Sequence, residues 1–239
     1  MRTDRFGSDA RAPLAACACL AALALLAACG GAGNLKSKDF DAEESAAVRR
    51  GVKPEPDAEA AVIETDYGLI VVELYPNLAP KMVERFKTLV REGFYDGTTF
   101  HRINPRTGVI QGGDPNSKDA DPSNDGAGDS PYPDVPAEFS DVPFERGTLG
   151  AARQGAHPAF GNQPALSEEE AYDTANCQFY ITLRRVPEWD EQYTVFGRVI
   201  RGMDTVSVIG DAPVRPGSER PDPSIPIRRI SLQPRTTFK

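Results

Sequence analysis

The chain has 239 residues, of which 40% are hydrophobic and 26% charged, and it carries a formal net charge of -8 at pH 7. A chain of this length and composition predicts one or two globular domains. The excess of acidic groups argues against nucleic acid as a partner, and against adsorption to an anionic membrane through charge.

The N-terminal segment has the organisation of an export signal. Three arginines (Arg2, Arg5 and Arg11) precede the uncharged run LAACACLAALALLAA at residues 14–28. This run is too short for a membrane-spanning helix, which needs roughly 20 apolar residues, and it matches the apolar core of a signal peptide. It leads into LAAC, which resembles the bacterial lipobox and implies a lipid on Cys29 once residues 1–28 are removed. The alternative is an ordinary signal peptide in which this cysteine occurs by chance.

Residues 29–58 are predicted to form a flexible tether from Cys29. They contain few large apolar residues, charges of both signs and two prolines near the end of the segment. A flexible segment of this length has an end-to-end distance of roughly 30 Å. Removal of the signal would leave Cys177 as the one thiol of the folded part. We therefore expect no internal disulfide and a domain stabilised by its core.

Residues 59–239 are predicted to form one mainly β domain. Residues 79–95 space their apolar side chains as in an amphipathic helix, with Pro80 suited to its first turn and Gly93 to its end. A second, short helix is expected after Gly202. Eight short β-rich runs are separated by turn-rich loops: 61–65, 69–74, 98–103, 108–112, 147–153, 178–183, 194–200 and 225–232. This pattern predicts a closed eight-stranded antiparallel barrel capped by two α-helices.

Side-chain alternation predicts a polar set on one face of this barrel. Residues two apart on a strand share a face, which places Arg102 on the face opposite His101 and pairs Gln178 with Tyr180. If the strand that carries Gln111 is their neighbour, one face offers a guanidinium, two amides and an aromatic ring. We expect His101, on the other face, to be a buried structural histidine.

Five stretches of the domain resemble the cyclophilins, the peptidyl-prolyl isomerase family. They are GLIVVELYPNLAPKMVERFKTLVREGFYDGTTFHRI, VIQGGDP, GTLGAAR, CQFYITL and YTVFGRVIRGMD. They follow the family's order and cover residues 61 to about 210 with interruptions. The resemblance implies an eight-stranded barrel capped by two helices, with the active groove on its outer face.

The resemblance also implies roles for individual residues. Arg102 matches the catalytic arginine, and Gln111 matches the glutamine that positions substrate and arginine. The other matched positions belong to the peptide groove and its apolar proline pocket: Val109, Ala152, Arg153, Gln178, Tyr180, Trp189 and Tyr193. Two positions depart from the family pattern, because Gly108 replaces an aromatic residue and Glu188 replaces a tryptophan that some members use to bind cyclosporin.

The implied activity is rotation about X-Pro bonds in exported proteins. A fixed donor that binds the twisted imide stabilises it more than either planar ground state, and arginine is suited to this because it stays charged. No nucleophile, cofactor or metal is required. The expected partners are proline-containing segments of exported proteins and, through the lipid on Cys29, a membrane. We expect a monomer located in the cell envelope. An aspartate directly after the lipidated cysteine would resemble an inner-membrane retention signal. This chain has Gly30 at that position, which favours the outer membrane.

Two other functions stay open. One is a proline-peptide binding module or holdase chaperone with incidental turnover, although a pure binder does not need the set formed by Arg102, Gln111 and Gln178. The other is a calcium-dependent surface module, suggested by the acidic loop at residues 114–129. Counting twelve residues from Asp121 reaches a tyrosine where an EF-hand needs a bidentate glutamate, which argues against this site.

Residues 154–176 form an insertion relative to the compact family pattern. Ser167 and Glu170 have the spacing of a capping box and predict a one-turn helix within the insertion. Because the insertion links two strands of the predicted groove, we expect it to border the peptide site and to influence which chains enter.

Overall fold

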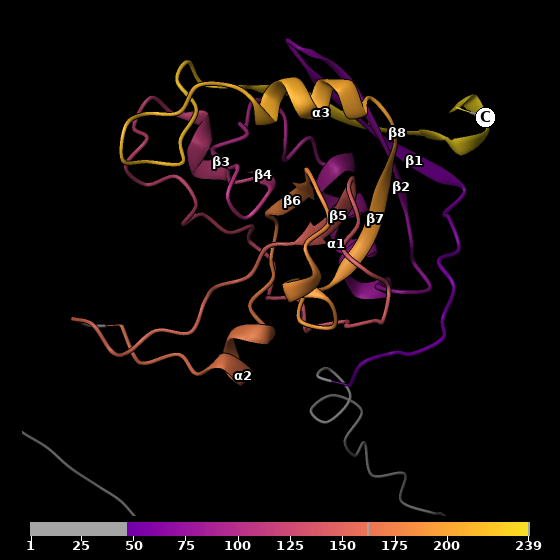
Figure 1. The fold of residues 1–239 in the computed structure, drawn as a ribbon, viewed down its shortest axis with the longest axis horizontal. Helices are drawn as coiled ribbons and strands as arrows, with labels where there is room; N and C mark the ends of the chain where they lie inside the picture. The colour runs from indigo at the N-terminus through magenta and orange to yellow at the C-terminus, as the bar shows by residue number, and fades with distance from the viewer. Residues whose placement is uncertain (1–46, 162, 239) are drawn as a thin grey trace, which may run out of the picture. The chain divides into compact units, whose positions relative to one another are not determined.

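The computed structural model describes residues 47–161 and 163–238 (Figure 1). The predicted signal peptide and Cys29 lie outside these residues. Within the described part of the chain, no helix combines the length and apolarity needed to cross a membrane.

One eight-stranded sheet forms the framework of the domain. Its strands lie in the order β3-β4-β6-β5-β7-β2-β1-β8, and every neighbouring pair is antiparallel. Their bounds are β1 (Glu59–Thr65), β2 (Gly68–Leu74), β3 (Arg102–Asn104), β4 (Val109–Gly112), β5 (Thr148–Ala151), β6 (Phe179–Thr182), β7 (Val195–Arg201) and β8 (Ile227–Pro234). The predicted eight-stranded antiparallel architecture is confirmed.

The predicted closure of the barrel is wrong, because the sheet is open and β3 and β8 are its edges. β3 has three residues where the sequence predicted a strand from residue 98. Its outer edge is occupied by a loop, since the Ile103 N–H donates to the Glu219 carbonyl at 2.6 Å. The segments 97–100 and 225–227, just before the two edge strands, meet through a few backbone hydrogen bonds. These contacts bridge the opening locally without forming the continuous ladder that closure requires.

Two helices pack on the sheet as predicted, α1 (Pro80–Arg91) and α3 (Met203–Gly210), and α2 (Glu168–Tyr172) lies in the insertion. Short 3₁₀ turns occupy Pro115–Lys118, Pro187–Trp189 and Arg235–Phe238. α1 has Pro80 at its start, and Gly93 follows its last turn with φ 67°, a conformation that favours glycine.

The N-terminus of α1 is capped from a distant loop. Ala79 supplies no side-chain cap. The two carboxylate oxygens of the buried Glu138 instead accept hydrogen bonds from the N–H groups of Lys81 (3.0 Å) and Met82 (2.9 Å). Burial raises the pKa of the Glu138 carboxyl, and these two hydrogen bonds oppose that shift. A negative group at a helix N-terminus satisfies free N–H groups and complements the helix dipole.

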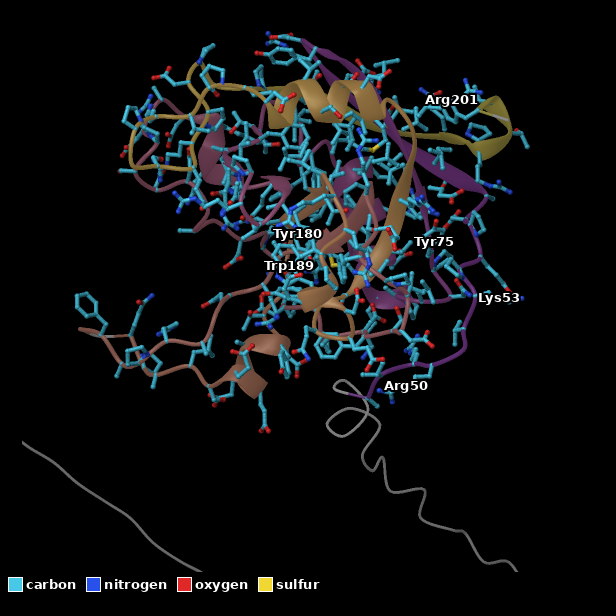
Figure 2. All side chains as sticks on the ribbon, in the orientation of Figure 1. Arg50, Lys53, Tyr75, Tyr180, Trp189 and Arg201 are labelled. Carbon is cyan, nitrogen blue, oxygen red and sulfur yellow. The ribbon has the colours of Figure 1, made fainter. Side chains whose placement is uncertain are left out.

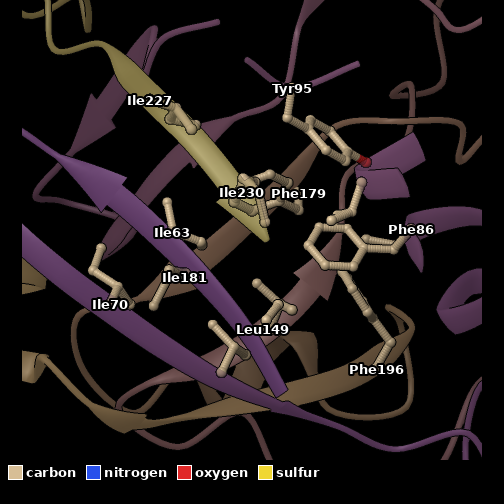
Figure 3. Packing of buried hydrophobic residues seen from close by; sticks show 14 of the residues in the cluster. Ile63, Ile70, Phe86, Tyr95, Leu149, Phe179, Ile181, Phe196, Ile227 and Ile230 are labelled. Atoms are coloured by element: carbon tan, nitrogen blue, oxygen red, sulfur yellow. The ribbon is translucent and has the colours of Figure 1, made fainter. Parts of the chain in front are cut away.

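The main core lies between α1 and the sheet (Figure 3). The Phe86 ring on α1 lies 5.3 to 5.7 Å from the rings of Tyr95, Phe179 and Phe196. Phe179 also contacts the rings of Tyr95 and Phe100. Cys177 is a free, buried thiol beside this core, and burial raises its pKa to about 12.

The packed part of the chain begins before residue 59, where the sequence placed the end of a flexible tether. The Arg49 N–H donates to the Phe139 carbonyl at 2.9 Å, and the Arg49 carbonyl accepts from the Asp141 N–H at 3.1 Å. Val52 packs against a hydrophobic cluster of the domain, and Asp57 pairs with Lys87 at 2.8 Å. Backbone pairing and a single valine leave no periodic pattern in the sequence, so the boundary was placed too late.

Candidate active site

Three polar side chains form a hydrogen-bonded row across β3, β4 and the start of β6. Arg102 lies opposite Gln111 in the β3/β4 ladder, and its Nη1 donates to Gln111 Oε1 at 3.1 Å. Gln111 Nε2 donates in turn to Gln178 Oε1 at 3.0 Å. β4 pairs with both β3 and β6, so the condition set in the sequence analysis is met and the three side chains share a face.

The two glutamines open onto a groove of about 410 Å³. The groove is also lined by Ala152 from the segment after β5 and by Asp129 from the acidic loop. Gln163 of the insertion also lines it. The expectation that the insertion borders this site is therefore confirmed by position.

The acidic loop at residues 114–129 is fastened to the groove by Gln178. Gln178 Nε2 donates to the carbonyls of Gly126 (3.2 Å) and Gly128 (2.9 Å). The buried Asp114 accepts hydrogen bonds from the backbone N–H groups of Asn116 (2.8 Å) and Gly126. Across residues 47–161 and 163–238, no three acidic, histidine or cysteine side chains converge as metal ligands. Asp114 thus holds the acidic loop in shape through bonds to its backbone.

An aromatic cluster lies beside the row, where the sequence predicted an apolar pocket. The Tyr180 ring lies 5.1 Å from Trp189 and 6.1 Å from Tyr193, centroid to centroid (Figure 2). Val109 packs into the same cluster and is buried. Phe144, which the sequence analysis missed, stacks on Tyr180 at 6.1 Å. A single phenylalanine in a proline-containing loop has no periodicity, so no sequence pattern pointed to it.

Arg153 connects the insertion to this cluster. Its guanidinium lies between the rings of Tyr172 (4.8 Å) and Tyr193 (4.4 Å) and binds Glu168 at 3.0 Å. Such stacking suits a planar, weakly hydrated cation. The Arg153 side chain therefore fixes α2 against the rim of the cluster, whereas the resemblance implied only a contribution from its strand.

The capping box predicted for the insertion is confirmed. Ser167 Oγ accepts from the Glu170 N–H at 3.2 Å, and the Glu170 carboxylate accepts from the Ser167 N–H at 2.9 Å. The two hydrogen bonds satisfy N–H groups that the first turn of a helix leaves free. α2 is therefore started by a local signal and held in place by Arg153.

Gly108 lies where the family pattern has an aromatic residue. Its φ is 78°, and a Cβ at this position would lie 2.7 Å from Cγ of Arg184. The stem of Arg184 thus occupies the space into which a side chain at residue 108 would extend. Glu188, at the other departure from the pattern, is exposed.

Glu219 is the second residue at the site that the sequence analysis missed. Its carboxylate accepts from Arg102 Nε at 2.5 Å and from Asn104 Nδ2. It belongs to the loop between α3 and β8, more than a hundred positions from its partners. No local pattern in the sequence relates two segments so far apart.

His101, the residue just before β3, is buried, as expected. It is 5% exposed, and neither ring nitrogen has a hydrogen-bond partner among the described residues. Burial lowers the pKa of His101 to about 4, against about 6.5 for an ordinary histidine. The ring is therefore neutral at pH 7.

The lowered pKa predicts a loss of stability in acid. Between pH 6.5 and 4 the unfolded chain binds the His101 proton and the folded chain does not, so the free energy of unfolding falls as the pH falls. The loss is at most about 3 kcal/mol. Denaturant unfolding at several pH values should show this loss in the wild type and in the control His157→Gln. In His101→Gln, the free energy of unfolding should depend less steeply on pH. Parallel pH profiles for the wild type and His101→Gln would contradict the prediction.

Comparison with known proteins gives a consistent result. A family model described as "Cyclophilin type peptidyl-prolyl cis-trans isomerase/CLD" matches residues 60–232. A "Probable peptidyl-prolyl cis-trans isomerase" of Brucella suis is 38% identical over 179 residues, which are 73% of this chain and 83% of the relative. A "Peptidyl-prolyl cis-trans isomerase-like 1" of Gibberella zeae is 37% identical over 159 residues, which are 66% of this chain and 84% of the relative.

A solved structure has the same fold. It is a cyclophilin type peptidyl-prolyl cis-trans isomerase of Cryptosporidium parvum, crystallised in the presence of the dipeptide Ala-Pro. It superposes with a TM-score of 0.58 at 27% sequence identity and covers 73% of this chain and 98% of the solved chain. Since the family model spans residues 60–232 and the curated relatives match over more than four fifths of their length, this chain belongs to the cyclophilin-type peptidyl-prolyl cis-trans isomerase family.

Proposed function

We propose that this chain accelerates rotation about X-Pro bonds in exported polypeptides, with Arg102 as the donor to the twisted imide. The observation that carries the proposal is the row from Arg102 through Gln111 to Gln178, which lies at a groove and beside an aromatic cluster. The Arg102 side chain is 39% exposed. It is therefore accessible to a peptide.

The chemistry follows from the electronic structure of the amide. Resonance gives the C–N bond partial double-bond character and a rotation barrier of about 18–20 kcal/mol. In the twisted transition state the proline nitrogen becomes pyramidal and regains its lone pair. A guanidinium N–H that binds this nitrogen stabilises the twisted state more than either planar isomer and lowers the barrier. No proton is transferred and no covalent bond is made or broken.

The surrounding residues would orient the peptide. The aromatic cluster around Tyr180 would offer an apolar surface for the proline ring. The extended peptide would run along the segment at Ala152 and Arg153, where the Ala152 N–H is already bonded to the Gln178 carbonyl at 3.0 Å. Gln111 holds the Arg102 guanidinium through Nη1. Its neighbour Gln178 fixes the amide of Gln111 in the orientation that presents Oε1 to the arginine.

The proposal is tested by measuring isomerisation of X-Pro peptides at catalytic concentrations of the full chain. Uncatalysed exchange takes roughly 10 to 100 s, which makes acceleration easy to detect. The competing function is a proline-peptide binding module or holdase. That function predicts saturable peptide binding and, at most, incidental turnover that does not depend on Arg102.

We further propose that the domain acts in the cell envelope, tethered to a membrane through lipid on Cys29. The support is the apolar run at residues 14–28 and the LAAC sequence that ends at Cys29. Gly30 in place of aspartate favours the outer membrane. The substrates would then be proteins that fold after export.

The anchor predicts a clear partitioning result. Expressed in a bacterium with its own signal sequence, the wild type should partition almost entirely into the detergent phase of a Triton X-114 extraction. Cys29→Ser should move to the aqueous phase because it lacks an acylation site. Cys177→Ser changes the buried cysteine of the domain and should partition into the detergent phase, as the wild type does. Recovery of the wild type in the aqueous phase would contradict the proposal that Cys29 carries a lipid.

A further inference from the structure

We propose that Glu219 is a positioning residue for Arg102, and that its carboxylate sets the plane in which the guanidinium meets the imide. This inference rests on the function proposed above for Arg102. It assigns a second acceptor to the arginine in addition to Gln111, from a loop outside the stretches that resemble the family.

The backbone brings Glu219 to the site. The loop between α3 and β8 runs along the open edge of β3, where the Glu219 carbonyl accepts from the Ile103 N–H at 2.6 Å. The loop is closed on itself, because the Arg215 N–H donates to the Arg220 carbonyl at 2.9 Å. The place of the carboxylate is therefore fixed by main-chain pairing.

The Glu219 carboxylate bridges two side chains of β3 that share a face. Oε2 accepts from Arg102 Nε at 2.5 Å, and Oε1 accepts from Asn104 Nδ2. Asn104 cannot turn its amide freely, because its Oδ1 accepts from the Thr107 N–H at 2.9 Å. The buried asparagine thus holds one oxygen of Glu219 and leaves the other to the arginine.

Two fixed contacts define the orientation of the planar guanidinium. An arginine has five N–H donors in a rigid fork. Glu219 takes the donor at Nε and Gln111 takes one at Nη1. Neither of these contacts uses Nη2, whose donors would be available to the substrate. With one of the two contacts removed, the guanidinium could turn about the remaining contact and sample other planes.

The carboxylate has two opposing effects on catalysis. It orients the arginine, and it also offsets part of the positive charge that attracts the imide nitrogen. Glu219→Ala removes both effects, whereas Glu219→Gln removes the charge and keeps an oxygen acceptor. If orientation dominates, the alanine variant is the slower of the two.

The experiment uses the full chain as wild type, Glu219→Ala, Glu219→Gln and the matched control Arg215→Ala. Arg215 lies in the same loop and pairs with Asp222 at 3.4 Å, without contacting Arg102. We expect Glu219→Ala to lower kcat by roughly tenfold with KM within twofold of the wild type. Glu219→Gln should recover part of the loss, and Arg215→Ala should match the wild type.

A spectroscopic readout separates positioning from loop stability. The Nε–H resonance of Arg102 in ¹⁵N NMR should be slow to exchange in the wild type and in Arg215→Ala, and fast in Glu219→Ala. An unchanged kcat and unchanged Nε–H exchange in Glu219→Ala would overturn the inference, as would an equal loss of kcat in Arg215→Ala. Failure of the proposed function looks different, since Arg102→Ala would then turn over as fast as the wild type.

Discussion

Replacement of Arg102 by alanine is expected to lower kcat/KM for X-Pro isomerisation by about 10²- to 10³-fold, the usual cost of removing one preorganised donor to a transition state. The loss should appear in kcat, because the proposed hydrogen bond forms only when the imide nitrogen regains its lone pair. The dissociation constant of a proline peptide should change little. NMR exchange measurements on a tetrapeptide substrate give both quantities in one sample.

Lysine at the same position tests the geometry of the donor. Arg102→Lys keeps the positive charge but offers one compact ammonium group, which cannot maintain contacts at two separate nitrogens. We expect its rate to lie closer to that of Arg102→Ala than to the wild type.

A second arginine provides the control. Arg228 on β8 forms an exposed pair with Asp66 at 2.6 Å and lies outside the residues that line the groove. Arg228→Ala should retain the wild-type rate. Equal rates for wild type and Arg102→Ala, with peptide binding intact, would favour the binding module or holdase.

Alternation along the strands is the reason that most of the site was predictable. A strand places residues two apart on one face whatever its partner is, so Gln178 and Tyr180 had to share a surface once β6 was recognised. The local signals of α1 and α2, namely Pro80, Gly93 and the capping box at Ser167, act within a few residues and were equally readable.

Contacts between distant segments were not predictable in this way. Glu219 and Phe144 reach the site from irregular loops, and the packing of Val52 depends on a surface built by other parts of the chain. The open edge at β3 was not predictable for the same reason. The strand stops short because a loop pairs with it, and no periodicity records which loop will do so.

One face of β6 belongs to the core and the other faces the site. Mutations on the two faces can therefore distinguish effects on stability from effects on activity. The Phe179 ring points into the core, where it meets the rings of Phe86, Tyr95 and Phe100. Its neighbours Gln178 and Tyr180 point to the groove side. The Phe179 ring therefore belongs to the core and takes no part in the row of polar side chains or the groove.

Phe179→Ala is expected to lower the free energy of unfolding by about 3–5 kcal/mol, because it leaves a cavity among the three rings that surround this fully buried side chain. For a domain of this size the melting temperature should fall by roughly 6–20 °C. Phe160→Ala is the matched control, since this ring is 81% exposed and its loss should change the free energy of unfolding by less than about 0.5 kcal/mol.

Calorimetry on the two variants measures these differences, and the isomerisation assay at low temperature measures activity per folded molecule. Because Phe179 stabilises the framework and makes no contact with substrate, the folded fraction of Phe179→Ala should retain kcat within a few-fold of the wild type. A melting temperature within about 2 °C of the wild type would contradict the assigned packing, since even 1 kcal/mol shifts it by about that much.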